Sequence, residues 1–144
     1  TRRSSDLCRT CVIMPEPQYR ENLPEGCPLP ESGPIQEEMI MYRFVHNPPS
    51  EADFASHVAL GKITSSKDPR FFCRALSLSV FSTYKEAKKW QSKFKLPIAK
   101  IILRENDGRI CLDGKPQKKH YAWWPHASCD VLGTISEIEN FQDE

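Results

Sequence analysis

Residues 75–90 carry the clearest local pattern in the chain and constrain its fold most strongly. Apolar residues alternate with serines over 76–81, which is typical of a strand with one buried face. From Tyr84 onward the apolar residues recur every three or four positions, as they do on one face of a helix. Thr83, with a glutamate three residues later, has the spacing of a capping box, so the helix should begin at Tyr84 and end before Pro97.

Other segments predict the rest of a sheet and a second helix. Ser50, with a carboxylate three residues later, has the spacing of a helix start, and the glycine at position 61 fits a helix C-cap. These two signals predict a helix over 51–61. Asn106-Asp107-Gly108 between two apolar segments predicts a tight antiparallel hairpin. We therefore expect the α+β class, with two helices and a small, mainly antiparallel sheet. Besides 75–81, the predicted strands cover 39–45, 98–103, 109–112, 120–124 and 131–138.

Residues 1–38 differ in composition from the remainder of the chain. They contain half of its 12 prolines and show little periodicity, which is typical of an extended or disordered arm. We expect an irregular, Pro-rich, Cys-bearing arm over residues 1–38 and a compact α+β domain over residues 39–144. A chain of 144 residues is long enough for one substantial core.

Composition and charge limit the class of protein. With 27% charged and 39% hydrophobic residues, the chain has the composition of a soluble globular protein. A formal net charge of +1 gives no overall argument for nucleic acid, but bases outnumber acids over 83–119, whereas 130–144 is acidic. The basic region 85–119 therefore suggests nucleic-acid binding, and a solvated surface is the alternative.

The sequence contains no membrane or leader signal. No apolar run approaches the roughly 20 residues of a membrane span, so no membrane association is expected. No signal-peptide core is present, and the first residue is not Met, which suggests a trimmed N-terminus. The cytoplasm is the default expectation.

Three cysteines in the arm suggest a metal. Cys8 and Cys11 form a CxxC pair, whose two thiolates can hold one tetrahedral zinc ion, and Cys27 supplies a third ligand. A second pair is missing, because Pro30 stands where its last cysteine would fall. A disulfide between Cys8 and Cys11, or two free thiols, are the open alternatives.

The segment 120–124 is the densest aromatic cluster. Trp123 and Trp124 predict a strand that closes the core with a tryptophan on each face. Alternatively, Trp123 belongs to a stacking wall for a base, a nicotinamide ring or a partner side chain. His120, His126 and Cys129 nearby offer a second possible ligand group for a metal.

Several catalytic motifs are absent from the sequence, including the GxSxG elbow, the Walker A loop, GxGxxG and HExxH. A different constellation is present. Arg43 lies on an early predicted strand, Ser82 and Thr83 end the middle strand, and Glu137 and Glu139 form a Glu-x-Glu near the C-terminus. In these positions the chain resembles the arginine-serine-glutamate type of the ADP-ribosyltransferase-like superfamily.

This resemblance implies an enzyme that uses NAD. Arg43 would hold the NAD phosphates or ribose, and Ser82, beside Thr83, would position the nicotinamide ribose. Glu139 would be the catalytic carboxylate and Glu137 would assist the acceptor. Cleavage of the glycosidic bond requires a carboxylate near the ribose and a cation on the diphosphate.

The sequence thus leaves three functional hypotheses. The first is a NAD-handling transferase, and the second is a non-catalytic module that docks on a protein partner through its arm and its Trp-rich, basic surface. The third is nucleic-acid binding through residues 85–119.

Overall fold

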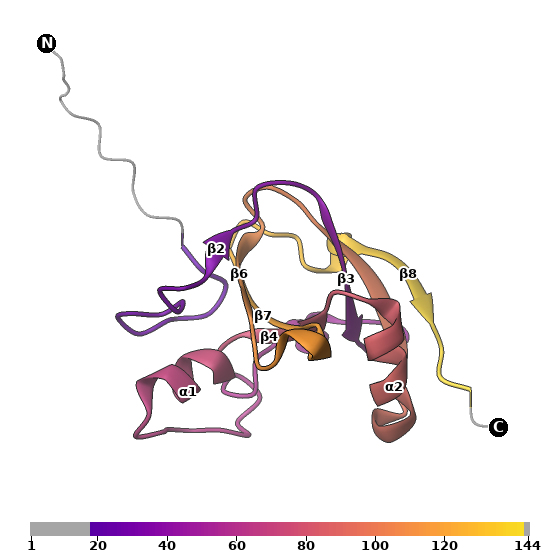
Figure 1. The fold of residues 1–144 in the computed structure, drawn as a ribbon, viewed down its shortest axis with the longest axis horizontal. Coiled ribbons are helices and arrows are strands. Elements are labelled where there is room, and N and C mark those ends of the chain that lie inside the picture. The colour runs from indigo at the N-terminus through magenta and orange to yellow at the C-terminus, as the bar shows by residue number, and fades with distance from the viewer. Residues whose placement is uncertain (1–17, 143–144) are drawn as a thin grey trace, which may run out of the picture.

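The computed structural model describes residues 18–142, and within that range seven strands form one sheet (Figure 1). All paired strands are antiparallel, in the order β2-β6-β7-β4-β3-β5-β8. Together with two α-helices in the same range, this confirms the α+β class, with a larger sheet than expected. The strands are β2 Gly33–Pro34, β3 Met39–Phe44, β4 Leu78–Phe81, β5 Ile98–Leu103, β6 Gly108–Leu112, β7 His120–Pro125 and β8 Ile135–Glu139.

The sheet is divided at its centre. β3 and β4 share a single register pair, Tyr42 with Phe81, whereas β3 pairs with β5 along its whole length. β4 pairs over its four residues with β7 on its other side. The sheet therefore consists of two groups of strands, β2-β6-β7-β4 and β3-β5-β8, that separate on one side of the Tyr42–Phe81 pair.

Helix α2 (Tyr84–Phe94) forms where the sequence predicts it. The Thr83 hydroxyl accepts a hydrogen bond from the Glu86 N–H at 3.3 Å, and Lys95 ends the helix in the left-handed conformation with φ 57°. Ala87 and the partly buried Trp90 pack against Phe81 and Ile98 of the sheet. Figure 1 places α2 beside β3, on the opposite side of the molecule from α1.

Helix α1 (Pro69–Ala75) was not predicted, and its last residue, Ala75, was expected to begin the strand 75–81. Asp68 caps it by accepting hydrogen bonds from the N–H groups of Arg70 and Phe71, and Pro69 stands at the first helical position. Asp followed by Pro is a local helix start signal.

The helix predicted over 51–61 is only the short 3₁₀ turn η1 (Glu51–Phe54). Its start is as predicted, since the Ser50 N–H donates to Asp53 Oδ2 at 3.0 Å. The Ser56 N–H, which would extend the helix, donates instead to Glu21 Oε2 at 2.9 Å. A carboxylate 35 residues earlier in the chain therefore ends the helix.

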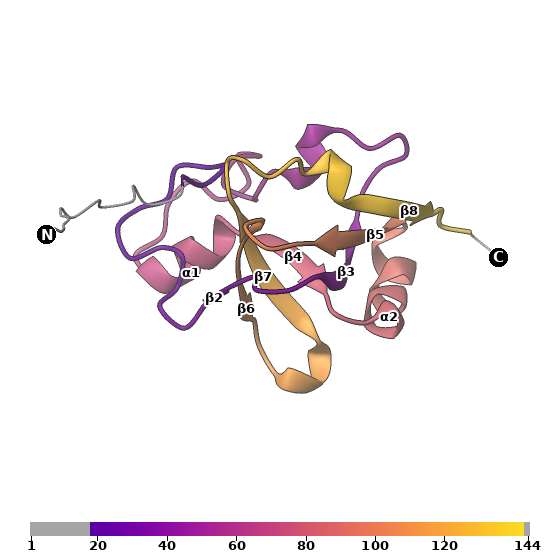
Figure 2. The ribbon, with the colours of Figure 1, turned by 90° about the horizontal axis from the view of Figure 1, so that it is seen from above.

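The predicted hairpin between 98–103 and 109–112 is wrong, although both strands exist. β5 pairs with β3 and β8, and β6 pairs with β2 and β7. Gly108 has φ 135°, and a Cβ there would lie 2.2 Å from the Trp124 carbonyl oxygen. The glycine therefore serves the close approach of β7. The true hairpin is β6–β7, which projects from the sheet in Figure 2.

The last predicted strand, over 131–138, is also only partly correct. It starts as the 3₁₀ turn η3 (Leu132–Thr134), and its second half forms the edge strand β8. Ile138 of β8 pairs with Ala99 of β5 and packs on the main core.

The two tryptophans of β7 face opposite sides of the sheet, as predicted. Trp123 belongs to the main core with Met41, Val80 and Ile101. Trp124 belongs to a smaller cluster with Leu29, Cys73 and Ala122. Both rings are buried, at 0% and 1% exposure.

Packed structure is also present before residue 39, where the compact domain was predicted to begin. Cys27 forms a disulfide with Cys73 of α1, Leu29 and Ile35 are buried, and β2 pairs with β6. The disulfide and these apolar side chains hold residues 18–38 against the domain despite their proline content. Among the described residues, no helix has the length and apolar character needed to cross a membrane.

Candidate functional site

Arg43 joins the two groups of strands at the point where they separate. Its Nε donates to the backbone oxygen of Asp53 at 2.9 Å, and its Nη1 donates to that of Ser79 at 2.7 Å. The guanidinium carbon lies 5.6 Å from the centre of the Phe54 ring. Burial lowers the pKa of Arg43 to about 10, against the opposing effect of Asp53, so the side chain remains charged at neutral pH.

A cavity of about 740 Å³ lies beside Arg43, within the range of typical ligand pockets, about 300–1,000 Å³. We call it the main cavity. Its walls come from β3, β4, the end of α2, the loop after η1 and the β6–β7 hairpin, which carries the short turn η2 (Pro116–Lys118). Its lining residues are Arg43, Phe44, His57, Lys62, Ser79, Phe81, Trp90, Phe94, Leu96, Asp113, Gly114, Lys115, Lys118 and His120.

The apolar wall of the main cavity is a connected group of aromatic rings. Phe44 makes edge-to-face contacts with Phe81 and Phe94, with ring centres 6.2 and 5.3 Å apart. Trp90 stacks on Phe94, with centres 6.0 Å apart and an angle of 21° between the ring planes. Phe94 is 49% exposed, so part of its ring is accessible from the cavity.

The polar wall is basic, with one carboxylate. Of the lining residues, Arg43, Lys62, Lys115 and Lys118 are cations and only Asp113 is an acid. Asp113 lies 3.5 Å from Arg74 Nε and 3.5 Å from His120 Nδ1. The main cavity thus combines positive charge, exposed ring faces and a single carboxylate, and it suits an anionic ligand that carries a planar ring.

The structure places Ser82 and Thr83 at the start of α2 and not in the lining of the main cavity. The Ser82 N–H donates to the Lys119 carbonyl at 2.9 Å, and the Thr83 hydroxyl is occupied as the helix cap. Their neighbour Phe81 does line the cavity. The sequence motif therefore lies next to the cavity, and its hydroxyl residues form the helix start.

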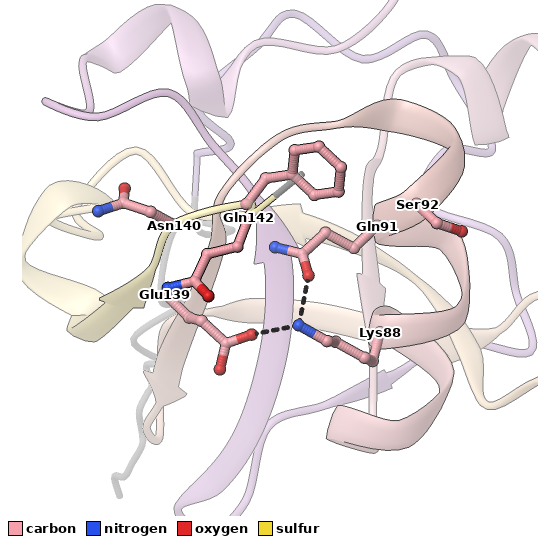
Figure 3. A pocket seen from close by; sticks show the side chains of 7 residues that line it. Lys88, Gln91, Ser92, Glu139, Asn140 and Gln142 are labelled. Carbon is pink, nitrogen blue, oxygen red and sulfur yellow. Dashed lines mark hydrogen bonds and ion pairs between the residues drawn. The ribbon is translucent and has the colours of Figure 1, made fainter. Parts of the chain in front are cut away.

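Glu139 lies at a different place, in a pocket that it shares with Lys88, Gln91 and Ser92 of α2 (Figure 3). Its carboxylate accepts from the Tyr84 hydroxyl at 2.7 Å and from Lys88 Nζ at 2.9 Å, and Lys88 also donates to Gln91 Oε1 at 2.9 Å. Bonds from Lys88 and then Tyr84 hold the pKa of Glu139 below its usual value. Glu139, Lys88 and Gln91 line a separate polar cavity of about 400 Å³.

Among the described residues, no single cavity therefore gathers the predicted Arg43, Ser82 and Glu139. Arg43 lines the main cavity, whereas Glu139 fastens β8 to α2. Glu137 is exposed on β8, opposite Lys100 in the register.

The described residues do not form a ligand set for either predicted metal site. Cys27 is bonded to Cys73, so its sulfur is not a thiolate ligand, and Cys8 and Cys11 lie outside the described range. Within residues 18–142, no group of three or more His, Cys, Asp or Glu side chains could hold a metal ion. This includes the predicted group of His120, His126 and Cys129.

The two free cysteines of the described chain are not activated nucleophiles. Burial raises the pKa of Cys111, and it raises that of Cys129 to about 12. The thiolate is the reactive form, so a raised pKa argues against nucleophilic catalysis by either residue.

The tryptophan that lines the main cavity is Trp90 and not the predicted Trp123. Trp123 is fully buried and donates Nε1–H to the Asp107 carbonyl at 3.0 Å. The helical spacing that begins at Tyr84 puts Trp90 on the apolar face of the predicted helix. Asp113 was not predicted as a site residue, and His120 was predicted only as a possible metal ligand. In the sequence, the aromatic pair Trp90 and Phe94 around Lys93 was the available signal for the aromatic wall of the cavity. The position of the β6–β7 hairpin has no such signal in the sequence.

Comparison of the chain with models of known protein families, with curated protein sequences and with solved structures found no match.

Proposed function

We propose that the main cavity binds a nucleotide of the NAD class and that the chain is an ADP-ribosyltransferase-like enzyme. The observation that supports this proposal is the combination of Arg43, the aromatic wall and a single carboxylate around one cavity. A nucleotide carries the complementary features, namely an anionic phosphate and a planar base.

The parts of the ligand follow from the parts of the cavity. A base or nicotinamide ring stacks against the aromatic wall that Phe94 and Trp90 form, where such stacking is worth about 1–3 kcal/mol per base. Phosphates lie toward the cations of the polar wall. Arg43 uses two N–H groups for backbone carbonyls, and a guanidinium has five, so donors remain for a phosphate oxygen.

Asp113 takes the catalytic role that the sequence motif assigned to Glu139. In the proposed reaction the bond from ribose C1′ to the nicotinamide nitrogen breaks, and nicotinamide leaves with the electron pair. A carboxylate beside C1′ stabilises the developing positive charge, and Asp113 is the carboxylate that lines the main cavity. The acceptor bonds to C1′ and releases its proton to His120, which lies 3.5 Å from Asp113.

Binding can be measured through intrinsic fluorescence. Trp90 is the tryptophan that lines the cavity, whereas Trp123 and Trp124 are buried. NAD, ADP-ribose or AMP should therefore quench the emission of the wild type with saturation. The Trp90→Phe variant should lose the quenching and still bind the ligand by calorimetry. Absence of heat and of quenching with all three ligands contradicts the proposal.

Catalysis is tested separately by nicotinamide release from NAD, separated by chromatography. Asp113→Asn should abolish release, and Glu139→Gln should retain it, because Glu139 lines another cavity. Loss of activity in Glu139→Gln with full activity in Asp113→Asn would restore the role predicted from the sequence. A wild type that binds NAD without releasing nicotinamide limits the function to binding.

We also propose an oxidising compartment in place of the default cytoplasm. The Cys27–Cys73 disulfide supports this, because such bonds are rare where glutathione and thioredoxin keep thiols reduced. Mass spectrometry of protein alkylated in fresh lysate of the native cells should show these two cysteines linked. Two alkylated thiols contradict the compartment and leave the nucleotide proposal unaffected.

A further inference from the structure

Another cavity adjoins the main cavity, between α2 and the turn η2. Its volume is about 400 Å³, and Trp90 and Lys118 belong to the walls of both cavities. We call it the outer cavity. Its lining residues are Glu86, Lys89, Trp90, Lys93, Gln117 and Lys118.

The outer cavity places cations around an indole face. Lys93 Nζ lies 5.2 Å from the centre of the Trp90 ring and 6.0 Å from that of Phe94. Lys89 is paired with Glu86 at 2.9 Å, so the single acid of the lining is neutralised. Lys93 and Lys118 therefore leave an excess of positive charge beside the ring.

Together, the two cavities form a basic, aromatic surface that is larger than one nucleotide. Phosphates that follow one another along a chain require cations at successive positions, and bases require exposed ring faces between them. The two cavities supply both in sequence, with Trp90 at their common wall.

We propose that the outer cavity binds single-stranded nucleic acid as the partner of the nucleotide in the main cavity. The inference rests on the proposed function, which assigns the main cavity to NAD. A single strand is favoured over a duplex because only unpaired bases expose faces that can stack on an aromatic side chain. An acidic peptide would use the lysines but would leave the face of Trp90 without a planar partner.

The test is fluorescence anisotropy with a labelled ten-residue oligo(dT) and oligo(U), over a range of salt concentrations. Binding should weaken with salt along a log–log slope of about −0.7 per phosphate contact. Lys93→Gln should weaken binding about 3- to 10-fold and reduce the slope by about 0.7, since it removes one contact.

Lys85→Gln is the matched control. Lys85 lies exposed on the same helix and lines neither cavity. This variant therefore removes the same positive charge at a position outside the proposed site. Equal weakening by Lys85→Gln and Lys93→Gln would show nonspecific attraction and overturn the inference. Equal affinity for a duplex or for a labelled oligo-glutamate peptide would overturn it as well.

Failure here is distinguishable from failure of the proposed function. Quenching of Trp90 by NAD together with no anisotropy change for either strand overturns only the nucleic-acid inference. Strand binding that depends on Lys93, in a protein that binds no NAD, supports the outer cavity and overturns the nucleotide proposal alone.

Discussion

Arg43 donates from Nη1 to the backbone oxygen of Ser79 at 2.7 Å, across the gap where β3 and β4 no longer pair. Ser79 pairs on its other side with Ala122 of β7. A charged side chain therefore satisfies a carbonyl that a neighbouring strand would satisfy in a continuous sheet. The same side chain lines the main cavity, so the opening of the sheet and the site depend on one residue.

We expect Arg43→Met to lower the free energy of unfolding by about 1.5–3 kcal/mol for each of the two hydrogen bonds lost. Arg43→Lys should recover little, because one ammonium does not reproduce a guanidinium fork that reaches two carbonyls. Urea unfolding measures both. The control is Arg104→Met. Arg104 is exposed and lies 3.4 Å from Glu38, so its replacement should lower the unfolding free energy by less than about 1 kcal/mol. Equal losses in Arg43→Met and Arg104→Met contradict the bridging role.

Gly108→Ala should be among the most destabilising small substitutions in the chain. At φ 135° the added Cβ would meet the Trp124 oxygen at 2.2 Å and Pro125 Cα at 2.8 Å, so backbone must move. We expect a loss of more than about 3 kcal/mol in unfolding free energy. Gly114→Ala, at φ 89° with open space around it, isolates the backbone strain and should cost about 1 kcal/mol. Similar melting temperatures for the two variants would be inconsistent with the close approach of β7.

The Cys27–Cys73 disulfide is expected to contribute up to about 4 kcal/mol. The two cysteines are 46 residues apart, and the estimate is the chain entropy removed from the unfolded state by closing such a loop. Replacing both with serine should lower the melting temperature, and a reductant should lower that of the wild type but not that of the double variant. Cys111→Ala, which removes a free thiol from the same apolar cluster, should keep the response to reductant. A wild type that melts identically with and without reductant rules out this contribution.

Asp53 should make stability depend on acid pH. Burial alone would raise its pKa, but hydrogen bonds from His46 and from the Ser50 N–H hold the pKa below the ordinary 3.8. A carboxyl with a lowered folded pKa stabilises the protein above its unfolded pKa and loses that effect as pH falls through the folded value.

Asp53→Asn should therefore lower the unfolding free energy by about 1–3 kcal/mol at pH 7. The difference from the wild type should shrink below about pH 4, where the unfolded carboxyl of the wild type begins to take up its proton. Urea unfolding at several pH values between 2.5 and 7 measures the difference. A difference that stays constant down to pH 2.5 assigns the effect to packing.

The sequence predicted elements whose signals are local and missed those set by distant residues. Helix α2 was placed correctly because its cap at Thr83 and its apolar stripe lie within the segment itself. The helix after Ser50 was too long, because the carboxylate of Glu21 that ends it is remote in the chain. Gly108 was taken for a hairpin signal because a tight turn and a close approach of β7 both require glycine.

The candidate site divides in the same way. Arg43 was predicted as a cofactor-binding residue, and it lines the main cavity. Glu139 matched the motif by order along the chain, but it lines a different cavity. Asp113 enters the site only because the β6–β7 hairpin folds toward the end of α2, and no spacing in the sequence encodes that position.

The covalent loop closed by Cys27 and Cys73 contains one side of the main cavity, including Arg43 and Lys62. Lys62 and Lys67 are exposed, so trypsin-like proteases have targets inside this loop. A cut at either lysine breaks the backbone but leaves both fragments in one molecule, joined through sulfur. The nicked protein therefore migrates as a single species until a reductant separates it into two.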